Sequence, residues 1–241
     1  MKSIFKVTDH SYLLLKKSDK FKQFGFADSK LHVSNLCYDI SIIDTFIKEN
    51  KITDVTLSNS TRNEEYILYV GRLENVKGIG TLIRAIKNTE LQLKIVGSGA
   101  AEETFRDIVQ NENINNIEFL GFQDKNSVFK LTLNSKFIVC PSEWYENYPF
   151  SIIESFLFSK PVVGAKIGGI PELVVHDQTG YLFEHGNEVD LRDKLIQLWR
   201  NGKLINEMGT NARNYIYDIV NFDTHWLKIN SIINNINRNE N

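Results

Sequence analysis

The alternation of short apolar runs with helix-like segments between residues 66 and 165 constrains the fold of this chain most strongly. The apolar runs are YILYV (66–70), LQLKIVG (91–97), IEFLG (117–121), FIVC (137–140) and PVVGA (161–165). The segments between them space their apolar residues as helices do, for example at Ile79, Leu82 and Ile86. Runs that are apolar throughout are typical of parallel strands buried on both faces. The pattern predicts an α/β, Rossmann-like fold, a doubly wound parallel sheet with helices on both faces.

The two ends of the chain do not continue this alternation. Residues 1–60 are expected to contain one or two helices and a strand around LHVSNL, which is too little for a second complete domain. Residues 187–237 are expected to be helical, and the Asn-rich end INNINRNEN should fray. In a doubly wound sheet ligands bind beyond the carboxyl ends of the strands, so candidate residues are sought in the loops there.

Charge and cysteine usage narrow the class of protein. With 28 Lys and Arg against 30 Asp and Glu, the net charge of −2 argues against a nucleic-acid binder. Neither a signal peptide nor an apolar run long enough to span a membrane is seen, although peripheral membrane contact is compatible with the sequence. Cys37 and Cys140 lack a CxxC spacing, which favours a reduced, cytoplasmic chain over a disulfide.

The loop GRLENVKG (71–78) follows the first apolar run and carries two cations. Gly71 allows a tight turn. Arg72 can grip phosphate oxygens in a bidentate manner, and Lys77 adds a point charge. A site for a phosphorylated ligand and a solvated turn are equally compatible with this loop alone.

The loop VGSGAAEE (96–103) looks like a dinucleotide-binding turn but departs from it at one position. The GxGxxG fingerprint requires glycine where this chain has Glu102, so a nicotinamide or flavin cofactor is not expected. A glycine turn that lets a base or ribose approach the backbone and an ordinary turn both remain open.

The stretch EWYENYPFSIIES (143–155) places two glutamates in apolar surroundings. Pro149 suits the first turn of a helix, and the unpaired amides of such a turn form an anion site. Glu154, one turn further along this helix, could accept hydrogen bonds from a ribose diol. Glu146 could face the group that is attached to the phosphates. The alternative is that Glu146 caps or is solvated while Glu154 meets a lysine, which the spacing alone favours.

Two further helix starts have structural explanations. Asp124 is a plausible N-cap for the segment DKNSVFKLTLNS. In GAKIGGIPELV, Gly168 and Gly169 permit a close turn, Pro171 begins a helix, and Glu172 falls in its first turn, where the helix dipole favours a carboxylate.

In this combination and order, the motifs resemble the carboxyl-terminal, donor-binding domain of glycosyltransferase family 4, the retaining group 1 transferases of the GT-B fold. The matching segments are YVGRLENVKG, KIVGSGAAEE, IEFLGF, PSEWYENYPFSIIESFLFSKPVVGAKIGGIPELV and TGYLF. The resemblance implies a largely missing amino-terminal domain. It divides the chain into residues 1–60 (remnant of that domain and linker), 61–220 (nucleotide-sugar-binding domain) and 221–241 (crossover helix and frayed tail).

The resemblance also implies roles for individual residues. Arg72 and Lys77 match the pair that neutralises the donor diphosphate, and with Glu146, near the transferred sugar, they form the expected catalytic set. Glu154 matches the ribose-binding glutamate, and the loops at Gly97 and at 121–122 would frame the base. The complete expected donor site is Gly71, Arg72, Lys77, Gly97, Gly121, Phe122, Glu146, Asn147, Tyr148, Pro149, Phe150 and Glu154. Relatives often have glycine at the position of Asn147.

The activity implied is transfer of a sugar, with retention, from a nucleoside-diphosphate sugar to a glycan or lipid-linked acceptor in cell-surface polysaccharide synthesis. No DxD motif occurs, and neither a metal nor a cofactor is expected, because the cations and a helix N-terminus could stabilise the leaving group. The expected partners are the donor, the acceptor and a separate chain that supplies the amino-terminal domain. The expected location is the cytoplasm or the inner face of the membrane.

Two other functions stay open at this stage. The chain could be a truncated, non-catalytic nucleotide-sugar-binding module, or half of a split enzyme that needs a partner chain. A GT-B epimerase is a third alternative, against which the E-x7-E spacing and the GRL…KG loop both argue.

Overall fold

The computed structural model describes residues 38–53, 57, 65–220 and the helix backbone of 222–239, together with the backbone of three short strands. These elements form two units, one of residues 43–216 and one of residues 1–42 and 217–241. Each unit is described by itself.

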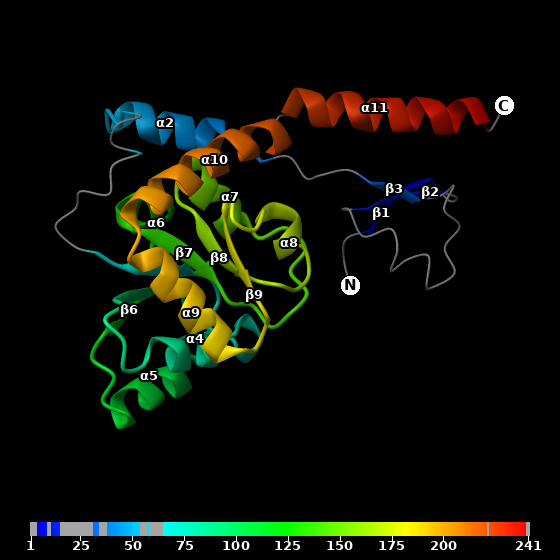
Figure 1. Cartoon of the computed structure of the whole chain (residues 1–241). Helices are drawn as coiled ribbons and strands as arrows, with labels where there is room; N and C mark the ends of the chain where they lie inside the picture. Colours follow the sequence, from blue (N-terminus) through cyan, green and yellow to red (C-terminus); the bar gives the residue numbers. More distant parts are fainter. Residues whose placement is uncertain are drawn as a thin grey trace. The chain divides into compact units, whose positions relative to one another are not determined.

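The larger unit is built on a six-stranded sheet (Figure 1). Its strands are β4 (Ile67–Val70), β5 (Leu93–Val96), β6 (Ile117–Gly121), β7 (Phe137–Cys140), β8 (Val162–Ala165) and β9 (Gly180–Phe183). Their order is β6-β5-β4-β7-β8-β9, and every neighbouring pair is parallel. The predicted doubly wound parallel sheet is confirmed, with a sixth strand in the TGYLF segment.

Helices connect the strands and cover both faces of the sheet (Figure 1). They are α2 (Ser41–Glu49), the 3₁₀ turn η2 (Asn75–Lys77), α4 (Ile79–Ile86), α5 (Glu102–Asn111), α6 (Lys125–Asn134), α7 (Phe150–Leu157), α8 (Ile170–Leu173), α9 (Glu188–Trp199) and α10 (Gly202–Val220). α4 packs against α5 and α9, whereas α6 packs against α7. Right-handed crossovers place these two groups on opposite faces of the sheet.

The helix starts follow the sequence signals closely. Asp124 caps α6, since its carboxylate accepts a hydrogen bond from the amide of Ser127 at 3.1 Å. Pro171 and Glu172 lie in the first turn of α8, as predicted. Pro149 is the N-cap of α7, one position before the predicted first turn, so α7 begins at Phe150.

An aromatic cluster joins the helices on one face of the sheet. Phe46 of α2, Phe129 of α6 and Phe158 at the end of α7 are 5%, 1% and 0% exposed. Their ring centroids lie 5.3–5.8 Å apart, and Phe46 meets the other two edge to face. This arrangement is favourable for the aromatic quadrupole and adds to the burial of the rings.

The smaller unit contains three short strands and a helix. β1 (Ile4–Thr8) pairs antiparallel with β2 (Ser11–Leu14), which pairs in parallel with β3 (Leu31–Val33). The predicted strand around LHVSNL is present as β3, whereas β1 and β2 were not predicted. The helix α11 (Phe222–Asn239) continues past the predicted end at 237, and residues 240–241 lie outside the described part.

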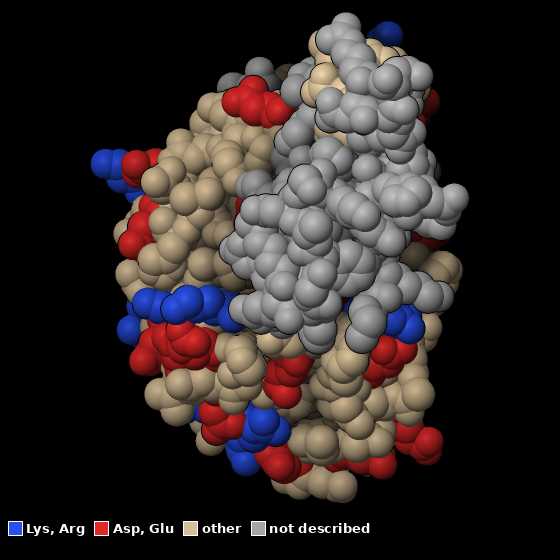
Figure 2. Space-filling view, turned by 90° about the vertical axis from the view of Figure 1, so that its right-hand side faces the viewer, with Lys and Arg blue, Asp and Glu red and all other residues tan. Residues whose placement is uncertain are grey.

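The described surface carries charges of both signs. On the face shown in Figure 2, Lys and Arg lie beside Asp and Glu, and the described part of this face has no continuous basic patch. Pairs of this kind include Lys166 with Glu184 and Arg84 with Glu188. Among the described residues, no helix combines the length and the apolar composition that crossing a membrane requires.

The aromatic cluster leads to a stability prediction. Phe158→Ala should lower the free energy of unfolding by about 3–5 kcal/mol, because it removes a fully buried ring and leaves a cavity. Urea denaturation followed by circular dichroism measures this change. Phe122→Ala is the matched control: Phe122 is 79% exposed, so its loss should be within about 0.5 kcal/mol. Equal losses in the two variants would contradict the assignment of the core.

Candidate functional site

A cavity of about 430 Å³ opens at the carboxyl ends of β4 and β7. The chain leaves β4 toward β5 and leaves β7 toward β8, in opposite directions along the sheet. Such a reversal between neighbouring parallel strands separates the loops and creates a crevice. The lining residues are Tyr69, Val70, Gly71, Arg72, Lys77, Val139, Cys140, Pro141, Ser142, Glu146, Pro149, Phe150, Ser151 and Glu154.

The loop after β4 presents Arg72 at the mouth of the cavity. The Tyr69 hydroxyl donates a hydrogen bond to the Arg72 carbonyl at 2.9 Å, and burial raises the pKa of this hydroxyl far above its ordinary value. Gly71 lies over the same hydroxyl, which a Cβ there would approach to 2.8 Å. The Arg72 side chain is 71% exposed and pairs with Glu74 at 2.7 Å. Its backbone is therefore fixed, while its guanidinium is solvated.

Lys77 and Glu146 form an ion pair inside the cavity. Nζ of Lys77 donates to Oε1 of Glu146 at 2.6 Å, and the two side chains are only 19% and 17% exposed. Gly78 brings the two loops together, because a Cβ at this position would meet the Pro141 carbonyl oxygen at 1.9 Å. Glu146 therefore has a lysine partner, and it is not simply a cap or a solvated carboxylate, as the alternative interpretation had it.

The loop that carries Glu146 is held by the glycine pair before α8. The Gly169 amide donates a hydrogen bond to the Glu146 carbonyl at 2.6 Å. A Cβ on Gly168 would meet the backbone nitrogen of Glu146 at 2.6 Å, and a Cβ on Gly169 would meet the Asn147 carbonyl oxygen at 2.1 Å. The sequence predicted only that these glycines permit a turn. Their lack of a side chain also allows the backbone of the Glu146 loop to pack directly against them.

α7 brings its first turn and Glu154 to the same cavity. Pro149 and Phe150 line the cavity where the helix begins, and Glu154 lies one turn further along the helix, as predicted. Amides in the first turn of a helix have no intrahelical acceptor. The cavity thus combines two cations, a helix N-terminus and two carboxylates.

Five residues of the expected donor site do not line the cavity: Gly97, Gly121, Phe122, Asn147 and Tyr148. The loop after β5 nevertheless adjoins the cavity, and the loop after β6 contacts that loop. The Gly97 amide donates to the Gly121 carbonyl at 2.9 Å, and a Cβ on Gly97, which has φ +134°, would meet the Gly71 carbonyl oxygen at 1.9 Å. The next loop along the sheet edge thus contacts the cavity through glycine backbones.

The polar lining residues that the sequence did not predict include Tyr69, Cys140 and Ser142, at the ends of two strands. Each lies within or shortly after a buried strand, where a residue of this type is usually interpreted as part of the core or of a turn. The signal that could have identified them is their position at the carboxyl ends of β4 and β7. Among the described residues, no group of three or more His, Cys, Asp and Glu is arranged to hold a metal ion.

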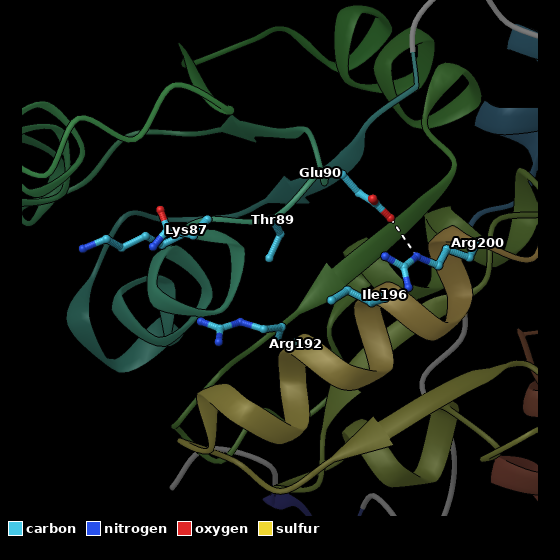
Figure 3. A pocket seen from close by; sticks show the side chains of 7 residues that line it. Lys87, Thr89, Glu90, Arg192, Ile196 and Arg200 are labelled. Atoms are coloured by element: carbon cyan, nitrogen blue, oxygen red, sulfur yellow. Dashed lines mark hydrogen bonds and ion pairs between the residues drawn. The ribbon is translucent and has the colours of Figure 1, made fainter.

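A second cavity, of about 340 Å³, lies between α9 and the loop that precedes β5 (Figure 3). This loop is at the amino end of its strand, whereas the first cavity is at the carboxyl ends. Its cations already have partners. The Arg200 guanidinium points toward Glu90 and donates to it at 2.8 Å. Nε of Arg192 donates at 2.9 Å to the Ala85 carbonyl, near the carboxyl end of α4. We therefore place the candidate site at the first cavity.

The fold and the site together define a doubly wound domain suited to binding an anionic ligand such as a nucleotide. A comparison with protein families specifies this class further: residues 52–215 match the family described as glycosyl transferases group 1, and the chain belongs to that family.

The chain is similar in sequence to two curated proteins. It is 31% identical over 148 residues to an uncharacterized glycosyltransferase of Methanocaldococcus jannaschii, covering 61% of this chain and 42% of the relative. It is 29% identical over 163 residues to N-acetyl-alpha-D-glucosaminyl L-malate synthase of Bacillus anthracis, covering 66% of this chain and 42% of the relative. The chain thus spans less than half the length of either protein.

A solved structure supports the fold. HepE of Anabaena, in complex with UDP and glucose, superimposes with a TM-score of 0.72 at 22% identity, covering 90% of this chain and 60% of that chain. The predicted fold, the carboxyl-terminal half of a GT-B architecture, is confirmed by this likeness.

The buried thiol of the cavity leads to a second prediction. Burial and, to a lesser extent, the charge of Glu146 raise the pKa of Cys140 from 9.0 to about 12, so the thiol is protonated at neutral pH. In a Cys37→Ser variant, the folded chain should resist iodoacetamide at pH 8, and the urea-unfolded chain should react. Since the unfolded thiol ionises first, stability should fall as the pH rises above about 9. Rapid alkylation of the folded variant would contradict this.

The glycine pair before α8 leads to a third prediction. Gly169→Ala should lower the free energy of unfolding by about 1–3 kcal/mol, because the backbone of Asn147 cannot rotate away from the new methyl group. Thermal and urea denaturation measure the loss. At Gly202, where a Cβ meets nothing within 4 Å, alanine should change stability by less than about 1 kcal/mol. A loss no larger than that of the Gly202 control would show that the contact is dispensable.

Proposed function

We propose that this chain supplies the donor-binding part of a transferase that moves a sugar from a nucleoside-diphosphate sugar to a glycan or lipid-linked acceptor. The observation that carries the proposal is the cavity at the sheet reversal, in which Lys77, Glu146 and Glu154 come together in a member of the glycosyl transferase family. The proposed reaction retains the anomeric configuration.

In the proposed mechanism, the protein stabilises the negative charge that develops on the diphosphate leaving group. Lys77 has three donor hydrogens and uses one of them on Glu146, so two can reach phosphate oxygens. Arg72 can leave its solvated contact with Glu74 at little cost, since exposed ion pairs are weak. The first-turn amides of α7 add fixed partial charges. These groups supply the stabilisation without requiring a metal.

In this proposal, the two glutamates contact different parts of the donor. Glu154, on α7, would accept hydrogen bonds from the ribose hydroxyls. Glu146, which is paired with Lys77, would lie where the phosphates meet the transferred sugar. A non-catalytic binding module would contain the same cavity, so donor binding and sugar transfer have to be measured separately.

Donor binding is the fourth prediction. Arg72→Ala and Glu154→Ala should each weaken binding of the preferred nucleotide by about 1.5–3 kcal/mol, because each removes a charge-assisted hydrogen bond. The nucleotide is chosen by a thermal-shift screen of UDP, GDP and ADP and their sugars, and affinities are measured by calorimetry.

The control for this experiment is Arg106→Ala. Arg106 is also exposed and paired, with Glu102 at 2.9 Å on α5, but it does not line the cavity. Its replacement should leave the affinity unchanged. Unaltered affinity in both the Arg72 and Glu154 variants would refute the site. Donor binding without sugar transfer by this chain would fit both a binding module and half of a split enzyme, and recovery of transfer with a separate chain that supplies the amino-terminal domain would distinguish them.

A further inference from the structure

We propose that Ser142 is a positioning residue, which orients the Glu146 carboxylate so that the site distinguishes a nucleotide sugar from the bare nucleotide. This inference rests on the proposed function and assigns a role to a residue outside the ion pair itself. Ser142 is 2% exposed and follows Pro141 directly after β7, within the lining of the cavity.

The Ser142 hydroxyl connects the backbone of the loop to the carboxylate. Oγ lies 2.9 Å from Oε1 of Glu146, and it accepts a hydrogen bond from the Trp144 amide at 3.3 Å. A hydroxyl has a single proton to donate. The carbonyl oxygens of Trp144 and Val76, at 3.3 and 3.4 Å, are more distant acceptors than the carboxylate. The proton of Ser142 is therefore assigned to Glu146, to which hydrogen bonds are also stronger because it is charged.

The same carboxylate oxygen receives Lys77. Oε1 of Glu146 thus has two donors, the ammonium at 2.6 Å and the hydroxyl at 2.9 Å. Within the described part of the chain, no hydrogen bond or ion pair reaches Oε2 of this residue. Because Glu146 lines the cavity, Oε2 is available to a hydroxyl of a bound sugar.

This asymmetry gives Ser142 a function that Lys77 alone cannot supply. A flexible lysine can follow the carboxylate into other rotamers, whereas a serine on a fixed loop cannot. With the hydroxyl removed, Lys77 still binds phosphate, but the orientation of Oε2 is no longer defined. The loss should therefore appear in recognition of the sugar and not in recognition of the diphosphate.

The test compares each nucleotide with its sugar: UDP with UDP-glucose, GDP with GDP-mannose and ADP with ADP-glucose. The pair that the wild-type chain binds best is then measured with Ser142→Ala by calorimetry. The Kd of the bare nucleotide should change less than about twofold, and the ratio of the two Kd values should shift about tenfold against the sugar. An unchanged ratio would overturn the inference and leave the proposed function intact. If the wild-type chain binds no pair, the proposed function fails, and this inference fails with it.

Two matched variants separate positioning from simple loss of a buried hydrogen bond. Ser155 on α7 is 0% exposed and donates to the Lys160 carbonyl at 2.9 Å, outside the cavity lining, so Ser155→Ala should lower stability without changing the ratio. Ser142→Thr keeps the hydroxyl and should restore the wild-type ratio. If Ser142→Ala does not fold, Ser142→Cys, a weaker donor, should shift the ratio in the same direction by less. A ratio that follows stability instead of the hydroxyl would overturn the assignment.

Discussion

The pairing of β4 with β7 is the constraint on which the rest of the site depends. Their paired positions Ile67 and Phe137 are 70 residues apart in the sequence, and they meet because the chain returns across the sheet after β6. The return brings two loops to one edge, where one carries Lys77 and the other carries Glu146. Without that pairing, Lys77 and Glu146 would not meet, and the cavity would lack one of its two walls.

Close contacts between backbones keep these loops in place. Gly78, Gly97 and Gly169 pack against the carbonyl groups of Pro141, Gly71 and Asn147, respectively. In each case a Cβ atom on the glycine would clash with the carbonyl oxygen. Hydrogen bonds between backbones reinforce the contacts, as from Gly169 to Glu146. The site is therefore positioned by contacts between main-chain atoms. These atoms are less mobile than the ends of long side chains.

Sequence reasoning predicted the sheet because each inner strand is a continuous apolar run, and this signal is local. It also placed Glu154 on a helix, since Pro149 marks where that helix begins. The Lys77–Glu146 pair was not predicted because its members are 69 residues apart in the sequence. Ser142 was missed because a serine after a strand usually reads as a turn, and its burial depends on the neighbouring loop. Short strands such as β1 carry too few residues for an alternating pattern to stand out.

The Lys77–Glu146 pair also bears on selectivity. The lysine brings its own counterion, held at 2.6 Å within the protein. A simple anion such as inorganic phosphate, bound at the remaining donors of Lys77, would be repelled by that carboxylate. A larger ligand offsets the repulsion with contacts elsewhere along the crevice, at α7 and the loop after β4. At the proposed donor site, the internal counterion would thus disfavour small anions and favour ligands long enough to contact several groups at once.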